Sequence, residues 1–146
     1  MKIKQLSLFL ENKPGALSAP VKLLARAKIN LLNLSIAEAR QYGILRLIVR
    51  DWEAAKKLLE DHGLLVKVTD VLAIEVADRP GALADVLGVL EQAGINLEYM
   101  YAFTLQRDSK GLLLFRFDDP DKAIAVLQKN NINVVGNVEL FQRLES

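Results

Sequence analysis

Two short loops in the sequence carry residue types that can hold a small charged molecule. Each loop follows an alternating, strand-like segment and places a polar residue, a basic residue and Pro-Gly just before a helical pattern. The loops are Asn12-Lys13-Pro14-Gly15-Ala16-Leu17 and Asp78-Arg79-Pro80-Gly81-Ala82-Leu83. Backbone N–H groups at the start of a helix attract anions, so each loop is a candidate site for a carboxylate.

An asparagine lies where each of the following helical patterns is expected to end. Asn30 and Asn96 occupy matching places in Ala27-Lys28-Ile29-Asn30-Leu31 and Ala93-Gly94-Ile95-Asn96-Leu97. An asparagine amide both donates and accepts hydrogen bonds, so it can hold an ammonium group or a carboxylate. Asn12 has the same capacity, whereas Asp78 suits an ammonium group better. The alternative is structural, because Pro-Gly is an ordinary turn and asparagine an ordinary helix terminator.

These loops and asparagines belong to an internal repeat that covers most of the chain. The second loop and the second Ile-Asn-Leu step follow the first ones by 66 residues. Farther along, the offset becomes 68, which pairs Gly43 with Gly111 and Asp51 with Asp119. A two-residue insertion in a hairpin loop explains the change of offset. The repeat predicts two domains, residues 1–69 and residues 70–146.

Each copy shows the same order of periodicities. In the first copy we expect strands near residues 3–10, 31–39, 43–50 and 64–68, with a turn at Gln41-Tyr42. Helices are expected to start with Ser18 as N-cap and to span residues 52–61 after the N-cap Asp51. The second copy repeats this with strands near residues 97–105, 111–118 and 133–138. Its hairpin loop is expected at residues 107–110, and its second helix at 120–129 after the N-cap Asp119.

The expected order of elements in each copy is βαββαβ, which is the ferredoxin-like arrangement. We therefore predict an α+β fold. It consists of two ferredoxin-like units packed side by side, each an antiparallel sheet with both helices on one face. The link at residues 67–71 is short. Ala73, Leu112 and Leu114 fall on the other sheet face, and this apolar character predicts a partner surface, most simply in a homodimer.

The composition argues against several classes of protein. Lys and Arg total 19 against 18 Asp and Glu, a net charge of +1, whereas nucleic-acid binders carry a basic excess. The chain has no cysteine, which removes disulfides, thiolate metal sites and thiol nucleophiles. No signal-peptide pattern and no apolar run of about 20 residues are found. We expect a cytoplasmic protein that uses no membrane, cofactor or metal.

The repeated pattern of a strand, [N/D]-[K/R]-P-G-A-L, a helix and A-x-I-N-L closely resembles the ACT domain over both copies. ACT domains are ferredoxin-like regulatory modules that bind amino acids, so the resemblance implies a stand-alone tandem ACT protein. It implies that Asn12 and Asn30 contact a ligand, with Asp78 and Asn96 at the matching places. It also implies that the strand carrying Tyr99 lies at the ligand-binding edge between the two domains. Lys28 departs from the pattern, because glycine is usual before Ile-Asn.

Catalysis and RNA binding are the rival functions. The single histidine, His62, is expected at a helix end, and the pair Asp118-Asp119 is expected to start a helix. No nucleophile–base pair, phosphate loop or two-histidine motif is present. The segment Lys110–Phe117 partly matches an RNA-recognition signature, but Leu112 and Leu114 replace the aromatic residues that would stack on bases.

The sequence therefore predicts a non-enzymatic sensor that binds a free amino acid and forms a dimer or contacts an enzyme of amino-acid metabolism. The alternative is a module for oligomerisation or enzyme docking whose ligand pockets are degenerate. The predicted binding residues are those of the two loops together with Asn30, Asn96 and Tyr99. The aromatic residues Tyr99, Tyr101 and Phe103 have packing as their alternative role.

Overall fold

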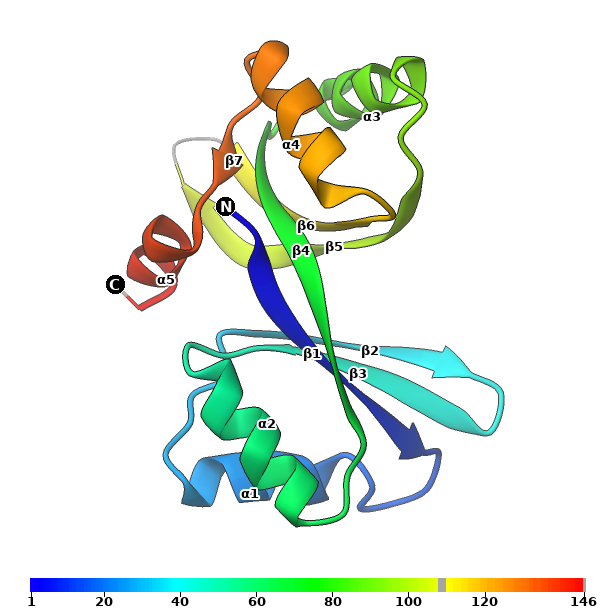
Figure 1. The fold of residues 1–146 in the computed structure, drawn as a ribbon, viewed down its shortest axis with the longest axis vertical. Coiled ribbons are helices and arrows are strands. Elements are labelled where there is room, and N and C mark those ends of the chain that lie inside the picture. The colour runs from blue at the N-terminus through cyan, green and yellow to red at the C-terminus, as the bar shows by residue number, and fades with distance from the viewer. Residues whose placement is uncertain (108–109, 146) are drawn as a thin grey trace. The chain divides into compact units, whose positions relative to one another are not determined.

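Up to residue 135, strands and helices follow one another in the order that the repeat predicts (Figure 1). The computed structural model describes residues 1–107 and 110–145, so Asp108 and Ser109 of the expected hairpin loop lie outside the described residues. The chain divides into two compact units. The N-terminal unit is Lys4–Thr69, and the C-terminal unit combines Met1–Ile3 with Asp70–Ser146. The division into two domains at residues 1–69 and 70–146 stays a prediction.

The N-terminal unit has the βαββαβ order. Its elements are β1 (Ile3–Glu11), α1 (Ser18–Arg26), β2 (Asn33–Ala39), β3 (Tyr42–Ile48), α2 (Trp52–Asp61) and the start of β4 (Val66–Ala77). The strand order is β2-β3-β1-β4, and β3 pairs with β2 and β1 in antiparallel fashion. Leu6, Leu8 and Leu10 alternate onto one face and are buried with Leu24 of α1 and Leu59 of α2. The period of two in the strand thus places the sheet's apolar face under both helices.

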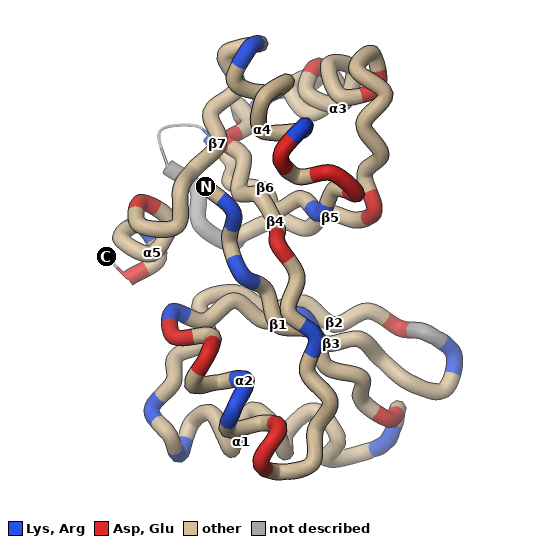
Figure 2. Tube along the Cα trace, in the orientation of Figure 1, with Lys and Arg blue, Asp and Glu red and all other residues tan. Residues whose placement is uncertain are grey.

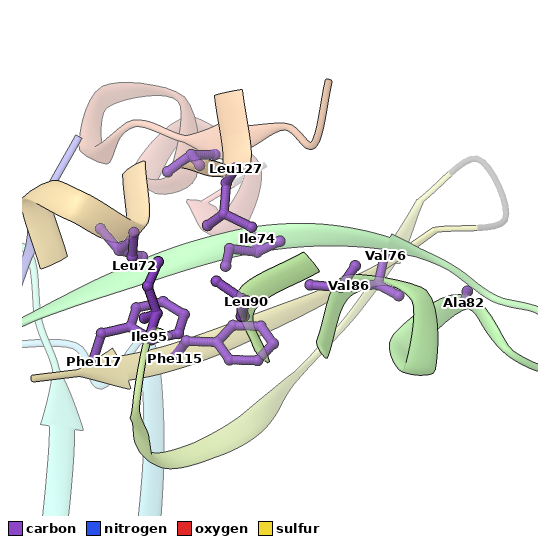
Figure 3. Close-up of a cluster of buried hydrophobic side chains, with 12 residues drawn as sticks. Leu72, Ile74, Val76, Ala82, Val86, Leu90, Ile95, Phe115, Phe117 and Leu127 are labelled. Atoms are coloured by element: carbon purple, nitrogen blue, oxygen red, sulfur yellow. The ribbon is translucent and has the colours of Figure 1, made fainter. Parts of the chain in front are cut away.

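The C-terminal unit repeats this architecture. Its elements are the rest of β4, α3 (Ala82–Gln92), β5 (Leu97–Arg107), β6 (Lys110–Phe117), α4 (Pro120–Lys129), β7 (Val134–Val135) and α5 (Asn137–Glu145). The strand order is β5-β6-β4-β7, and the neighbouring strands are antiparallel. Figure 3 shows Leu90 of α3 and Leu127 of α4 pointing toward Ile74 and Phe115 of the sheet. The predicted α+β, ferredoxin-like class is confirmed.

The helix starts illustrate how local sequence sets element boundaries. Asp51 caps α2 by accepting from the Ala54 N–H at 3.2 Å, and Asp119 caps α4 by accepting from the Lys122 N–H at 3.1 Å. Both predicted N-caps are confirmed. The N-cap of α1 is Leu17 rather than Ser18, whose hydroxyl instead donates to the Gly15 carbonyl at 3.2 Å. Because that bond ties Ser18 to the preceding turn, the helix begins one residue earlier than expected.

Three other expectations about the strands are wrong. The closing strand expected at residues 64–68 begins only at Val66, and it continues through the expected link at 67–71 as one strand, β4. The turn between β2 and β3 lies at Arg40 and Gln41, with Arg40 in the left-handed region at φ 54°. The strand expected at residues 133–138 is only Val134–Val135, and after Gly136 the chain forms α5.

The predicted partner surface on the C-terminal sheet is also wrong. Ala73 and Leu114 have no exposed surface and Leu112 is 3% exposed within the single chain. The C-terminal helix contributes to this burial, because Leu140 of α5 is fully buried and Arg143 of α5 pairs with Glu75, opposite Leu112 in the sheet. The apolar character of this face therefore reflects packing within the chain.

In the described part of the chain no helix is long and apolar enough to cross a bilayer.

Candidate functional site

A cleft of about 370 Å³ lies beside the first Pro-Gly loop, entirely within the N-terminal unit. Four of the predicted binding residues line it: Asn12, Lys13, Ala16 and Leu17. Pro14 and Gly15 shape the loop without lining the cleft; Gly15 has φ 86°, a conformation that glycine adopts at little cost. The loop and the start of α1 therefore lie together at one cavity, as a ligand site at this position requires.

The opposite wall of the cleft comes from the hairpin of β2 and β3. Sequence reasoning did not assign these residues to a site. They are Ile36, Ala37, Glu38, Tyr42 and Gly43, with Leu10 and Glu11 from the end of β1. The one signal that could have found them is the repeat itself, which preserves a glycine at positions 43 and 111.

Strand register explains why a hollow forms at Gly43. Leu10 of β1 and Glu38 of β2 both lie directly opposite Gly43 of β3. Residues opposite each other share a sheet face, so this cross-strand row has no side chain at its centre. The neighbouring row, Leu8–Leu45–Ile36, is filled by three large side chains. The sheet surface is therefore low at Gly43, where the Ile36 side chain partly covers it, and both residues line the cleft.

The electrostatic environment of the cleft is mixed. The Lys13 ammonium group lies 2.9 Å from the Glu11 carboxylate, and both side chains are largely exposed. No side chain caps the start of α1, in contrast to α2 and α4. The first turn of α1 also holds no acidic residue, so the helix itself supplies no carboxylate to neutralise the partial positive charge at its start. Carboxylates, an ammonium group, an amide and a helix start are thus available within one small region.

Asn30 lies elsewhere. It lines an open depression of about 440 Å³ with Val21, Ala25 and Leu31, at the end of α1 that is farther from the Pro-Gly loop. Lys28, in the place of the usual glycine, has φ 60°, and the matching Gly94 has φ 68°. The repeat therefore preserves the backbone conformation even where it does not preserve the glycine. The cleft does not bring Asn12 and Asn30 together.

In the C-terminal unit a second cleft, of about 390 Å³, lies between the first part of α3, the end of β4 and the loop before β7. Of the predicted residues, only Arg79 and Ala82 line it. Arg79 lies 3.3 Å from Asp85 of α3, an exposed ion pair. Asp78, Pro80, Gly81 and Asn96 are exposed and Leu83 is half-buried; none of these five lines this cleft. Gly81 repeats the left-handed conformation of Gly15, with φ 87°.

Glu75 is one of the charged residues that line this second cleft. Its carboxylate pairs with Arg143 of α5 and lies 3.6 Å from the Lys110 ammonium group. Burial by itself raises the pKa of Glu75, but the hydrogen bond and charge of Arg143 outweigh it, with help from Lys110 and Asn133. The pKa of Glu75 is therefore held below its ordinary value, and the group stays ionised.

The remaining candidates lie in β5 or at a helix end. Tyr99 and Tyr101 lie opposite Arg116 and Leu114, and Phe103 is 6% exposed. Neither of the two clefts includes them. His62 is the C-cap of α2, and its Nδ1 lies 2.9 Å from the Leu58 carbonyl, as expected for a residue at a helix end. Among the described residues, no cluster of His, Asp or Glu has the arrangement of a metal site.

Charge is dispersed over both units. Figure 2 shows Lys and Arg interleaved with Asp and Glu along the described chain. Several of these charges are already paired within one helix, including Lys56 with Glu60 and Lys57 with Asp61 on α2. Pairs of this kind leave little excess positive field to attract a phosphate backbone.

Comparisons with known proteins identify relatives of the whole chain. The profile of the family described as an ACT domain pair matches residues 1–144. The crystal structure of protein BT0572 from Bacteroides thetaiotaomicron is 42% identical, with 97% of each chain covered and a TM-score of 0.89. The ligand-free regulatory subunit of aspartate kinase from Thermus thermophilus is 14% identical, with 86% of this chain and 90% of that chain covered and a TM-score of 0.62. At this identity the second likeness shows the fold alone. No curated protein matches the sequence.

Proposed function

The chain belongs to the family of ACT domain pairs, and from this premise we propose that it is a non-catalytic regulatory protein that binds a free amino acid. The observation that carries the proposal is the cleft beside residues 12–17 in the N-terminal unit. It combines a helix start with polar side chains of both charge types in a volume within the usual range for ligand sites, roughly 300–1,000 Å³.

Both charged groups of an amino acid find partners in this cleft. The carboxylate fits the uncapped start of α1 and the Lys13 ammonium group. The ammonium group fits the carboxylates of Glu11 and Glu38. The Asn12 amide can serve either group, since it donates through Nδ2 and accepts through Oδ1.

The proposal includes the partners that the sequence predicts. A regulator of this kind transmits ligand binding to another protein, so we propose a dimer or a complex with an enzyme of amino-acid metabolism, in the cytoplasm. The two copies are expected to differ in their response. Asn12 lines a cleft, whereas its counterpart Asp78 does not line the cleft of its own unit.

A docking module without a ligand is the second candidate function. It is favoured by β2, which ends the strand order of the N-terminal unit and carries two exposed apolar side chains. Leu34 is 46% and Ile36 is 53% exposed. Exposed apolar residues on an edge strand are a common basis for pairing with another chain.

A thermal-shift screen against the twenty amino acids distinguishes the two candidates. A ligand that binds the native protein raises its melting temperature, so at least one amino acid at millimolar concentration should do so. Asn12→Ala should abolish or strongly reduce that shift, whereas the matched variant Asp78→Ala should retain it. If no amino acid shifts the wild-type protein, the sensor function is wrong and the docking function is favoured.

A further inference from the structure

The cleft of the N-terminal unit has an apolar half in addition to the polar rim that serves the charged groups of an amino acid. Two large apolar residues, Leu17 and Ile36, line this half and remain open to water. Leu17 is 39% exposed and Ile36 is 53% exposed. These side chains form exposed apolar surface. A ligand that buried them would gain free energy from the hydrophobic effect.

The Ile36 side chain packs against the backbone of the neighbouring strand. It lies over Gly43, where a Cβ atom would be 3.5 Å from its Cγ1. This contact orients Ile36 in advance, so a ligand need not order it. The Tyr42 ring packs edge-on against Phe9, with ring centroids 6.0 Å apart. Because side chains alternate between the two faces of a strand, this ring lies on the sheet face away from Ile36.

We infer that the ligand is an amino acid with a large apolar side chain, branched aliphatic or aromatic. The inference rests on the proposed function and specifies its ligand class. With its charged groups at Asn12 and the polar rim, such a ligand can extend its side chain over Gly43 toward Leu17 and Ile36. Glycine or serine would leave this half of the cleft exposed to water.

The second copy shows that the apolar half is specific to the N-terminal unit. In the C-terminal unit Ala102 lies opposite Leu113, just as Ile36 lies opposite Leu45 in the N-terminal unit. Likewise, Lys110 lies opposite Ala77, just as Tyr42 lies opposite Glu11. The counterparts of Ile36 and Tyr42 are thus a small residue and a charged one. The Lys110 ammonium group is also drawn to Glu75, at 3.6 Å. Selectivity for a large apolar side chain belongs to the N-terminal unit alone.

Isothermal titration calorimetry tests the inference. The full chain is titrated with leucine, phenylalanine, alanine, serine and glycine, and leucine or phenylalanine is expected to bind at least tenfold more tightly than glycine or serine. The keto analogue 4-methyl-2-oxopentanoate should bind more weakly than leucine, because it lacks the ammonium group that the carboxylates of the rim hold.

Two matched variants separate the cleft from the rest of β2. Ile36→Thr keeps the branched shape but removes apolar surface from the cleft, and it should weaken leucine binding about tenfold. Leu34→Thr makes a comparable change on the same face of the same strand, outside the cleft lining, and should leave leucine affinity within about twofold. Circular dichroism verifies that both variants are folded.

The outcomes distinguish this inference from the proposed function. If serine or glycine binds more tightly than leucine and phenylalanine, the inference is overturned while the sensor function stands. The same holds if Ile36→Thr is folded and leaves leucine affinity unchanged. If no amino acid binds, the proposed function itself fails.

Discussion

Individual residues show how the two copies have diverged in chemistry while keeping their backbone. Position 9 of the first copy is an exposed phenylalanine beside Tyr42, and the matching position 75 is a glutamate beside Lys110. An aromatic pair has thus been replaced by an ion pair at the same place in the sheet. In the C-terminal unit, Arg143 of α5 completes the charged group.

This charged group predicts a pH dependence of stability. The pKa of Glu75 is lower in the folded chain than its ordinary value of 4.5, so its contribution to stability is complete above that value and lost as the pH falls through the folded pKa. Glu75→Gln should therefore lose less free energy of unfolding than the wild type between about pH 5 and pH 3. Near pH 7 it should be less stable by about 1 kcal/mol, below the roughly 3–5 kcal/mol of a fully buried pair.

Urea unfolding at a series of pH values measures both effects. Glu139→Gln is the control. The Glu139 side chain also pairs with Arg143, but it is 49% exposed. It should change stability by less than Glu75→Gln at pH 7. If the stability of wild type and of Glu75→Gln changes with pH in parallel, Glu75 is not the source of the pH dependence.

At the scale of elements, α1 and α3 end in the same way despite different residues. Lys28 and Gly94 both have positive φ, and the following residue, Ile29 or Ile95, donates its N–H to the carbonyl of Leu24 or Leu90 at 2.9 and 3.0 Å. The left-handed conformation costs about 1–2 kcal/mol for a residue with a Cβ atom and little for glycine. The first copy therefore tolerates a strain that the second one avoids.

Reciprocal substitutions test this difference. Lys28→Gly should raise the free energy of unfolding by about 0.5 kcal/mol, because relief of strain exceeds the entropy cost of glycine. Gly94→Ala should lower it by about 1 kcal/mol, although no atom lies within 4 Å of the added Cβ. Chemical denaturation of both variants measures these changes. Equal effects of the same sign would show that backbone conformation is not the cause.

For the whole molecule, ligand binding and stability are linked. A ligand present at 100 times its Kd stabilises the native state by about 2.7 kcal/mol. For a chain of this size, about 2–4 °C in melting temperature corresponds to each kcal/mol. Saturating leucine should therefore raise the melting temperature of the protein by about 5–10 °C.

Scanning calorimetry over a leucine concentration series verifies this magnitude. The shift should grow with the logarithm of leucine concentration above Kd, as the linkage relation requires. Glycine at the same concentrations is the control. A leucine shift that is no larger than the glycine shift would contradict selective binding.

The sequence by itself determined the local features of this protein. The duplication, the helices near residues 52–61 and 120–129 and the N-caps Asp51 and Asp119 follow from periodicity and from side chains that act within a few residues. The Pro-Gly loops were identified for the same reason. The family resemblance lay in these local patterns, and the matching family profile confirmed it.

Tertiary structure decided which distant residues share a site. Ile36, Tyr42 and Gly43 meet the loop at Asn12 only because β3 pairs with β1 and β2 in one particular register, which sequence spacing does not encode. The same is true of α5, whose residue Arg143 pairs with Glu75, 68 positions away. Such pairings depend on long-range packing of whole elements, so the loop was predictable but the cleft and its apolar half were not.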